Sequence, residues 1–207
     1  MSKIHFAMIR VVIITALFLG SYGFVSAAGK YENFNWVSPN GWTGAVFDVP
    51  TWFAKDMLYS GREVIRFHDG FYDEQSTGFW TYAFALMVEQ SKQPTTQELL
   101  EETKRYFVGL ARGIGDKNIK DYPAEKIRVT TKSDWKTSDS SQYQSQLFFL
   151  ESYDPFTTGK PIKLNVKITT WPCSESYWAI HYTISPHPMS HTIWNLLDKE
   201  VKALKCW

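Results

Sequence analysis

Apolar and polar positions alternate most clearly in two segments near the end of the chain. The even-numbered positions of residues 162–168 are apolar, and the positions between them are lysine, asparagine and lysine. In residues 177–184 the even-numbered positions are tryptophan, isoleucine, tyrosine and isoleucine. A period of two is typical of a strand that buries one face. Because residues 172–174 read Pro-Cys-Ser, the pattern predicts an antiparallel hairpin with its turn at these residues.

A third segment, residues 80–88, has large side chains on one face and small ones on the other. Its even-numbered positions are Trp, Tyr, Phe, Leu and Val, whereas Thr81, Ala83 and Ala85 belong to the opposite face. This pattern predicts a central strand with another element packed closely over the alanines. Further strands, each bounded by residues typical of turns, are predicted at residues 44–49, 62–67, 125–132 and 142–151.

Two helices interrupt the predicted strands. The first begins at Thr95, where Glu98 completes a capping box, and it ends near Gly113 or Gly115. The second begins around Ser190 and has one apolar face. The order of several strands, a helix, several strands and a helix predicts an α+β domain. We expect a mainly antiparallel β-sheet with two helices packed on one face.

The N-terminal segment is typical of a cleavable secretory signal peptide. Lys3 and Arg10 accompany an apolar run that is too short and too interrupted by glycine for a spanning helix. Small residues at Ala27 and Ala28 offer a cleavage site. We therefore expect residues 1–27 to be a signal peptide, residues 28–207 to form a single domain, and the mature protein to be exported, either periplasmic or secreted. An uncleaved N-terminal anchor is the alternative.

Charge and length narrow the class of partner. The chain has 22 Lys and Arg against 21 Asp and Glu, and removal of residues 1–27 leaves 20 against 21. A surface so close to neutral attracts neither nucleic acid nor anionic lipid over long range, so we expect no nucleic-acid partner and no membrane span after signal cleavage. The remaining residues suffice for one core, and neither half alone would bury a comfortable one.

Both cysteines lie in the mature part of the chain. Cys173 and Cys206 would meet an oxidising compartment, which favours a disulfide between them. Such a bridge would tie the last helix to a strand end. Two free thiols are the alternative, since a bridge requires the two Cβ atoms to approach to about 4 Å.

Carboxylates and an imidazole crowd the stretch that follows the strand at residues 62–67. Glu63, His68 and Asp69, with His181 from a later strand, are the candidates for acid–base work or for a divalent metal. Strand alternation separates Glu63 from His68, however, so these side chains do not all converge from one strand. The alternatives are a strand end with a solvated acidic turn and, for His181, a histidine satisfied within the sheet.

The remaining chemistry-bearing patterns are sparse. His187 and His191 have the i,i+4 spacing of a zinc pair, but Pro188 and the expected cap at Ser190 favour a polar helix start. The sequence contains no Gly-x-Ser-x-Gly elbow and no glycine-rich loop that opens a helix. We therefore expect no cofactor and no metal.

Aromatic residues concentrate in the first half of the chain. Trp52 and Phe53 follow Pro50, and Phe71 and Tyr72 lie between acidic, turn-forming residues. In such settings these four side chains are the candidates for a surface that binds an apolar ligand, a sugar or a partner protein. A core that uses large side chains is the alternative.

Several segments resemble a family of small uncharacterised bacterial proteins. They are GREVIRF at residues 61–67, FWTYAF at 79–84 and DPFTTGKP at 154–161, with a helix ending in YFVGL at 106–110 between them. The likeness covers roughly residues 40–170 and implies a bacterial origin and a single domain, without assigning catalytic residues. The element order is also similar to that of PsbP-like exported domains, a likeness of fold alone.

The function that these observations favour is noncatalytic binding of an unknown protein or small-molecule partner by an exported domain. A metal-assisted hydrolase that uses Glu63, His68 and Asp69, with His181, is one alternative. A structural accessory subunit of an envelope assembly is another, and it would carry an uncovered apolar sheet face or edge.

Overall fold

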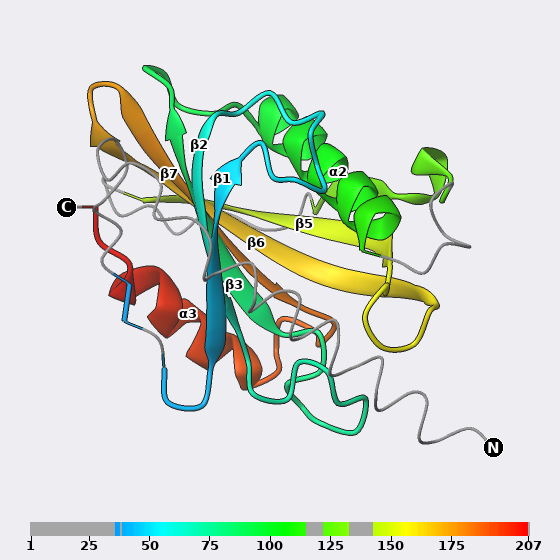
Figure 1. Cartoon of the computed structure of the whole chain (residues 1–207). Helices are drawn as coiled ribbons and strands as arrows, with labels where there is room; N and C mark the ends of the chain where they lie inside the picture. The colour runs from blue at the N-terminus through cyan, green and yellow to red at the C-terminus, as the bar shows by residue number, and fades with distance from the viewer. Residues whose placement is uncertain (1–35, 38, 115–121, 133–142, 207) are drawn as a thin grey trace, which may run out of the picture. The chain divides into compact units, whose positions relative to one another are not determined.

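The computed structural model describes residues 36–37, 39–114, 122–132 and 143–206, all of which belong to one compact unit, Asn33–Trp207. The predicted signal peptide lies outside the described residues and stays a prediction. A seven-stranded sheet has the order β1-β2-β3-β7-β6-β5-β4, and every neighbouring pair is antiparallel (Figure 1). The strands are β1 Thr43–Val49, β2 Gly61–Phe67, β3 Tyr82–Glu89, β4 Arg128–Thr131, β5 Gln144–Tyr153, β6 Pro161–Ser174 and β7 Tyr177–Ser185.

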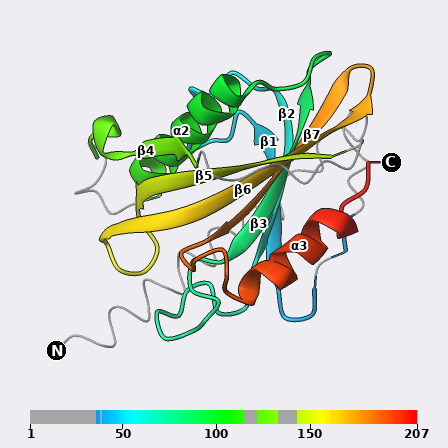
Figure 2. The same cartoon turned by 180° about the vertical axis from the view of Figure 1, so that it is seen from behind.

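Two helices accompany this sheet, α2 at Thr96–Gly113 and α3 at Ile193–Ala203, with a short 3₁₀ turn at Ala124–Lys126. The prediction of an α+β domain with a mainly antiparallel sheet is confirmed. The expectation that both helices pack on one face is wrong, because α2 and α3 cover opposite faces (Figures 1 and 2). Both faces of β3 are apolar and buried, so each face needs its own cover.

The two faces of β3 show how the sheet accommodates both helices. Phe84 and Leu86 belong to the larger core cluster, together with Leu99 and Phe107 of α2. On the other face Ala83 and Ala85 pack in a second cluster with Trp194 and Leu197 of α3, and with Trp36. The expectation that another element packs closely over the alanines is confirmed. Small side chains at these positions leave the space that the indole rings occupy.

Local signals set the ends of α2. The Thr95 side chain accepts a hydrogen bond from the Glu98 amide, and the Glu98 carboxylate accepts one from the Thr95 amide, so the predicted capping box is present.

Near the C-terminal end of the helix, a Cβ added to Gly109 would lie 2.5 Å from the backbone oxygen of Phe53. A glycine at this position therefore lets the loop between β1 and β2 pack directly against the helix.

Several boundaries differ from the sequence-based expectation. The strand predicted at residues 125–132 is a 3₁₀ turn at Ala124–Lys126 followed by the shorter β4, and β5 begins and ends two residues later than predicted. Trp80 is not part of β3: it has a φ of 48°, and the strand begins at Tyr82. The β6–β7 turn follows Ser174 instead of occupying residues 172–174, because β6 continues through an irregularity at these residues. Helix α3 begins at Ile193, later than Ser190 suggests, and its Thr192 cap makes no side-chain hydrogen bond. The His191 ring nitrogen Nδ1 accepts a hydrogen bond from the Ile193 amide in its place.

The C-terminal end of the chain is attached to the sheet by a disulfide between Cys173 and Cys206, whose Cα atoms lie 5.4 Å apart. Trp171 Nε1 contacts the Cys206 sulfur at 3.1 Å, so the bridge lies against the second core cluster. Across the described ranges no helix is both long and apolar enough to cross a membrane.

Candidate functional site

The four catalytic candidates lie in three different environments. Glu63 lies on the face of the sheet that α2 covers, whereas His181 belongs to the face that α3 covers. His68 and Asp69 follow the end of β2. The structure therefore brings His68 and Asp69 together and leaves Glu63 and His181 apart from them and from each other. Alternation along the strands causes this separation, since neighbouring positions point to opposite faces.

Glu63 is a fully buried carboxyl group beneath α2. The Tyr106 hydroxyl donates a hydrogen bond to its Oε1 at 2.7 Å, while Oε2 has no hydrogen-bond partner among the described residues. Burial raises the pKa of Glu63 to about 8, and the hydrogen bond from Tyr106 opposes the rise. The nearby Tyr82 hydroxyl is also buried without a partner, and burial raises its pKa as well. Glu63 is thus held in its neutral form inside the core, away from solvent.

His181 lies in an aromatic cage on the opposite face. Its ring centroid is 5.0 Å from that of Trp36 and 6.3 Å from that of Trp171. Neither ring nitrogen has a hydrogen-bond partner among the described residues, and the side chain is completely buried. Burial and, secondarily, the charge of Lys167 lower the pKa of His181 to about 3. The ring is therefore neutral and packs as an aromatic core side chain.

Hydrogen bonds hold Trp36 over the face of the sheet that α3 covers. Trp36 Nε1 donates to Glu200 Oε2 at 3.0 Å, and an Arg66 guanidinium nitrogen donates to the Trp36 carbonyl at 3.1 Å. Burial raises the pKa of Glu200, against the hydrogen bond from Trp36 and the charge of Arg66. These hydrogen bonds join the segment before β1 to β2 and to α3. Arg66 and Glu200 therefore have a structural role here.

His68 has a local structural role. Its Nδ1 accepts a hydrogen bond from the Gly70 amide at 3.0 Å and lies 2.6 Å from Asp69 Oδ1. Both contacts use one nitrogen, which accepts from the Gly70 amide when it carries no hydrogen and donates to the Asp69 carboxylate when it carries one. A Cβ on Gly78 would lie 2.0 Å from this nitrogen, which shows how closely the following loop covers the ring.

The two histidines with the spacing of a zinc pair lie against each other as stacked rings. The centroids of His187 and His191 are 4.1 Å apart with an interplanar angle of 12°. His187 Nε2 lies 2.9 Å from the Thr77 carbonyl oxygen, and His191 caps α3 through Ile193. Over the described part of the chain, no three His, Cys, Asp or Glu side chains gather as a metal would require.

The two aromatic pairs proposed as a binding surface differ in how far they are buried. Phe71 is 1% exposed, with ring contacts to Phe67, Trp80 and Phe156. Tyr72 is partly buried and packs against the same cluster. This pair therefore belongs mainly to the core, as the alternative interpretation of the aromatic excess expects. The Asp-Gly and Asp-Glu neighbours indicate a turn correctly, but the turn folds back over the sheet.

Trp52 and Phe53 lie in the loop between β1 and β2, residues 50–60. Trp52 is 54% exposed, whereas Phe53 is partly buried with its ring edge against Tyr106. The same loop exposes Leu58 to 75%, a residue that sequence reasoning missed. The Lys-Asp pair at residues 55 and 56 indicates a turn. It does not indicate which neighbours are exposed, since Ala54 and Met57 beside it are buried.

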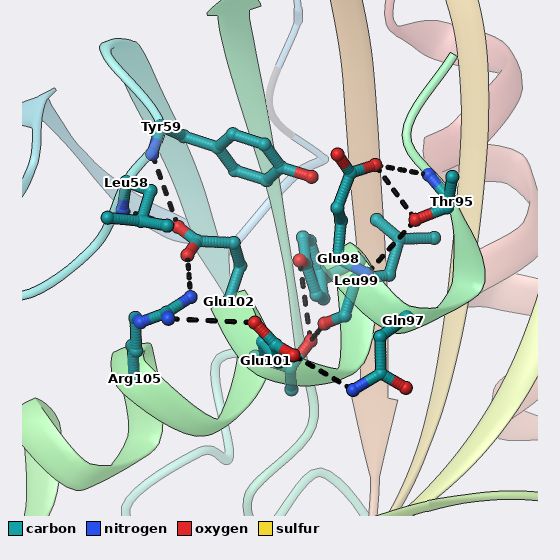
Figure 3. Close-up of polar contacts among 11 residues, drawn as sticks. Leu58, Tyr59, Thr95, Gln97, Glu98, Leu99, Glu101, Glu102 and Arg105 are labelled. Carbon is teal, nitrogen blue, oxygen red and sulfur yellow. Dashed lines mark hydrogen bonds and ion pairs between the residues drawn. The ribbon is translucent and has the colours of Figure 1, made fainter.

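A buried carboxylate holds the second half of this loop in place. Glu102 of α2 accepts hydrogen bonds through Oε2 from the amides of Leu58 and Tyr59, at 2.9 and 3.2 Å (Figure 3). Its Oε1 accepts a hydrogen bond from Arg105 at 2.5 Å. At the start of the loop, Thr51 Oγ1 accepts a hydrogen bond from the Ala54 amide. These bonds fix the backbone beneath two exposed apolar side chains.

We call the exposed side chains of Trp52 and Leu58, with the backbone that presents them, the loop 50–60 surface. Lys55 and Asp56 are exposed between them. Neither Trp52 nor Leu58 carries a group that transfers protons or binds metal, so the loop offers apolar contact at both positions, with one charge of each sign between them in the sequence. Contact of this kind suits recognition and not catalysis.

The DPFTTGKP segment that carries part of the family resemblance forms the β5–β6 turn. The buried Asp154 carboxylate accepts hydrogen bonds from the amides of Phe156, Thr157 and Thr158 and from the Thr158 hydroxyl. Gly159 has a φ of 64°, in the region that favours glycine. This motif is accounted for by the turn it builds.

Comparison with known proteins gives one weak likeness of fold. The solution structure of cyanobacterial PsbP (CyanoP) from Synechocystis sp. PCC 6803 is similar with a TM-score of 0.38 and 13% sequence identity, over 91% of this chain and 100% of that chain. No family model and no curated protein matches the sequence. The resemblance to a family of small bacterial proteins stays a prediction.

Proposed function

We propose that this chain is an exported, noncatalytic domain that binds a partner protein through the loop 50–60 surface. The observation that supports the proposal is the exposure of Trp52 and Leu58, at 54% and 75%, on a loop anchored from below by Glu102. A partner that covers these apolar side chains removes them from water, and this burial contributes about 25 cal/mol to the free energy of binding for each Å² of apolar surface.

The geometry suits a protein partner. Trp is the residue most enriched among side chains that dominate the affinity of protein interfaces. Because hydrogen bonds already hold the loop backbone, little conformational entropy remains to be lost on binding. Lys55 and Asp56 would then form the polar rim that surrounds the buried part of such interfaces.

A noncatalytic role is supported by the surroundings of the titratable candidates. Glu63 and His181 are completely buried on opposite faces of the sheet. His68 and Asp69, which contact each other, belong to a local turn. An acid–base pair must reach a common substrate atom within about 3 Å, and these side chains do not converge.

The experiment uses a photo-crosslinking amino acid at position 58, introduced into the full chain in the cells that produce it. We expect an adduct of discrete mass that disappears when Trp52→Ala is added to the same chain. The control places the crosslinker at Arg128, which is 72% exposed on the far edge of the sheet. Equal adducts from both positions, or no adduct from position 58, would contradict the proposal.

Export has its own test. Intact-mass analysis of the full chain, produced with its N-terminal segment, is expected to give a mature N-terminus at Ala28 or Gly29 in the envelope or secreted fraction. An unprocessed chain extracted from the membrane would contradict export with cleavage and would leave the binding surface to be judged by crosslinking alone.

A further inference from the structure

Strand β1 is an edge strand with few of the features that protect such edges. Within the described residues it pairs with one strand, β2, along all seven of its residues. Its sequence, TGAVFDV, carries a single charge at Asp48. The opposite edge strand, β4, is four residues long and begins with Arg128. Short length and charge protect an edge against strand addition, and β1 lacks the first and has little of the second.

We propose that β1 pairs antiparallel with β1 of a second copy of this chain, about a two-fold axis that passes through Val46. The two sheets would then form one continuous sheet across the interface. This inference goes beyond the proposed function, because it concerns the edge of the sheet and a self-complementary partner instead of the loop 50–60 surface.

The residue pattern of β1 is complementary to itself in this register. Val46 would face its own copy, and Ala45 would face Phe47 of the second copy. A small residue thus meets a large one on the face that α2 covers, where Ala45 and Phe47 already pack against the core. On the other face the two Val46 side chains, each 47% exposed, would cover each other. A two-fold axis makes every such pairing occur twice.

Charge selects the same register. With the axis at Val46, Asp48 faces Gly44 of the second copy, and all seven residues of β1 are paired. With the axis at Asp48, two carboxylates would face each other, which destabilises a strand pair. With the axis at Phe47, Pro50 would enter the pairing, and proline has no amide hydrogen to donate.

The first test measures the oligomeric state of the full chain by sedimentation and by light scattering. We expect a dimer at micromolar concentration. Val46→Lys would place two ammonium groups opposite each other and raise the dimer dissociation constant by about tenfold or more. The matched control Val46→Ile keeps an apolar, β-branched side chain and is expected to remain dimeric. Circular dichroism establishes that both variants are folded.

The second test reports the register. In Val46→Cys the two new thiols would lie on Cα atoms about 4.5–5.5 Å apart, within the range of about 4.4–6.8 Å that a disulfide spans. Mild oxidation is expected to give a covalent dimer in which peptide mapping finds the Cys173–Cys206 bridge intact. Arg128→Cys, on the other edge strand, is expected to form no covalent dimer under the same oxidation.

Three results would overturn the inference. One is a monomeric wild-type chain at all soluble concentrations. Another is a dimer that Val46→Lys leaves unchanged and that Val46→Cys does not crosslink. The third is a Val46→Cys chain that crosslinks to a different protein and not to itself, which would assign the edge to an extended segment of another partner. Crosslinking at position 58 succeeds or fails independently of all three.

Discussion

The substitution Glu63→Gln is expected to stabilise this domain in mildly alkaline solution and to flatten its dependence on pH. Glu63 is buried beneath α2, with a single hydrogen bond from Tyr106 to one carboxyl oxygen. Burial raises its pKa from 4.5 to about 8. The folded state therefore favours the protonated carboxyl, whereas the unfolded chain releases the proton near pH 4.5. Glutamine keeps the shape and the hydrogen-bond acceptor but cannot ionise.

The sign and the size follow from proton linkage. Between pH 4.5 and 8 the folded state binds the proton and the unfolded state does not, so stability falls as pH rises through this interval. At 1.36 kcal/mol per pKa unit, the complete loss is about 5 kcal/mol. Burial also raises the pKa of Glu200, which adds loss in the same direction. Removing the Glu63 contribution should shift the melting temperature by about 2–4 °C per kcal/mol.

Urea unfolding of the wild-type and Glu63→Gln chains, followed by circular dichroism from about pH 5 to pH 9, measures the difference directly. We expect the stability of the variant relative to wild type to grow by several kcal/mol across this range, whatever its constant offset. Glu175→Gln, in the exposed β6–β7 turn, is the matched control and should follow the wild-type profile. Parallel profiles for wild type and Glu63→Gln would refute the reasoning.

His181 supplies an internal check on the acid side. Its pKa falls from 6.5 to about 3 on burial. The unfolded chain therefore binds a proton between these values that the folded chain does not, and stability falls as pH drops below 6.5. Together the two groups predict a broad maximum between about pH 4.5 and 6.5. Glu63→Gln should remove the Glu63 part of the loss above the maximum and leave the part that Glu200 contributes. In the variant the His181 loss should begin as pH falls below about 6.5, and a variant that stays flat between pH 4.5 and 6.5 would contradict the His181 contribution.

The remaining predictions concern the bridge, the aromatic pairs and the loop–helix contact. Cys206→Ser removes the disulfide that joins two residues 33 positions apart in the sequence, and the free energy of unfolding should fall by about 3–4 kcal/mol. An unchanged urea midpoint would contradict a formed bridge. Phe71→Ala should lower stability by about 3–5 kcal/mol, whereas Trp52→Ala should stay within about 0.5 kcal/mol; thermal melts that rank them otherwise would contradict their assignment as core and surface. Gly109→Ala should destabilise by about 1–3 kcal/mol despite the higher helix propensity of alanine, because its Cβ meets the Phe53 backbone; a raised melting temperature would contradict that contact.

Local signals in the sequence determined most of the secondary structure. Alternation predicted β6 and β7, and the capping pair Thr95 and Glu98 set the start of α2. These signals act between residues that are close along the chain, so one sequence contains them. The sequence predicts a start of α3 around Ser190, whose hydroxyl is a common helix cap. In the structure the helix begins at Ile193, and the ring nitrogen of His191 accepts the hydrogen bond from the Ile193 amide. The cysteines were expected to pair from their compartment and from the terminal position of α3.

The tertiary structure decided which side chains are available for function. Phe71 and Trp52 both occur beside turn residues, yet one turn folds over the sheet and the other leaves its indole in solvent. The burial of a side chain depends on which distant segments of the chain pack against it. Phe156, in the turn between β5 and β6, packs against Phe71 in this way. The assignment of α2 and α3 to opposite faces has the same origin, because β3 buries both of its faces and the two helices reach it from distant parts of the chain. Sequence periodicity established that Glu63 and His181 lie in strands, and only long-range packing determined that each is enclosed beneath a different helix.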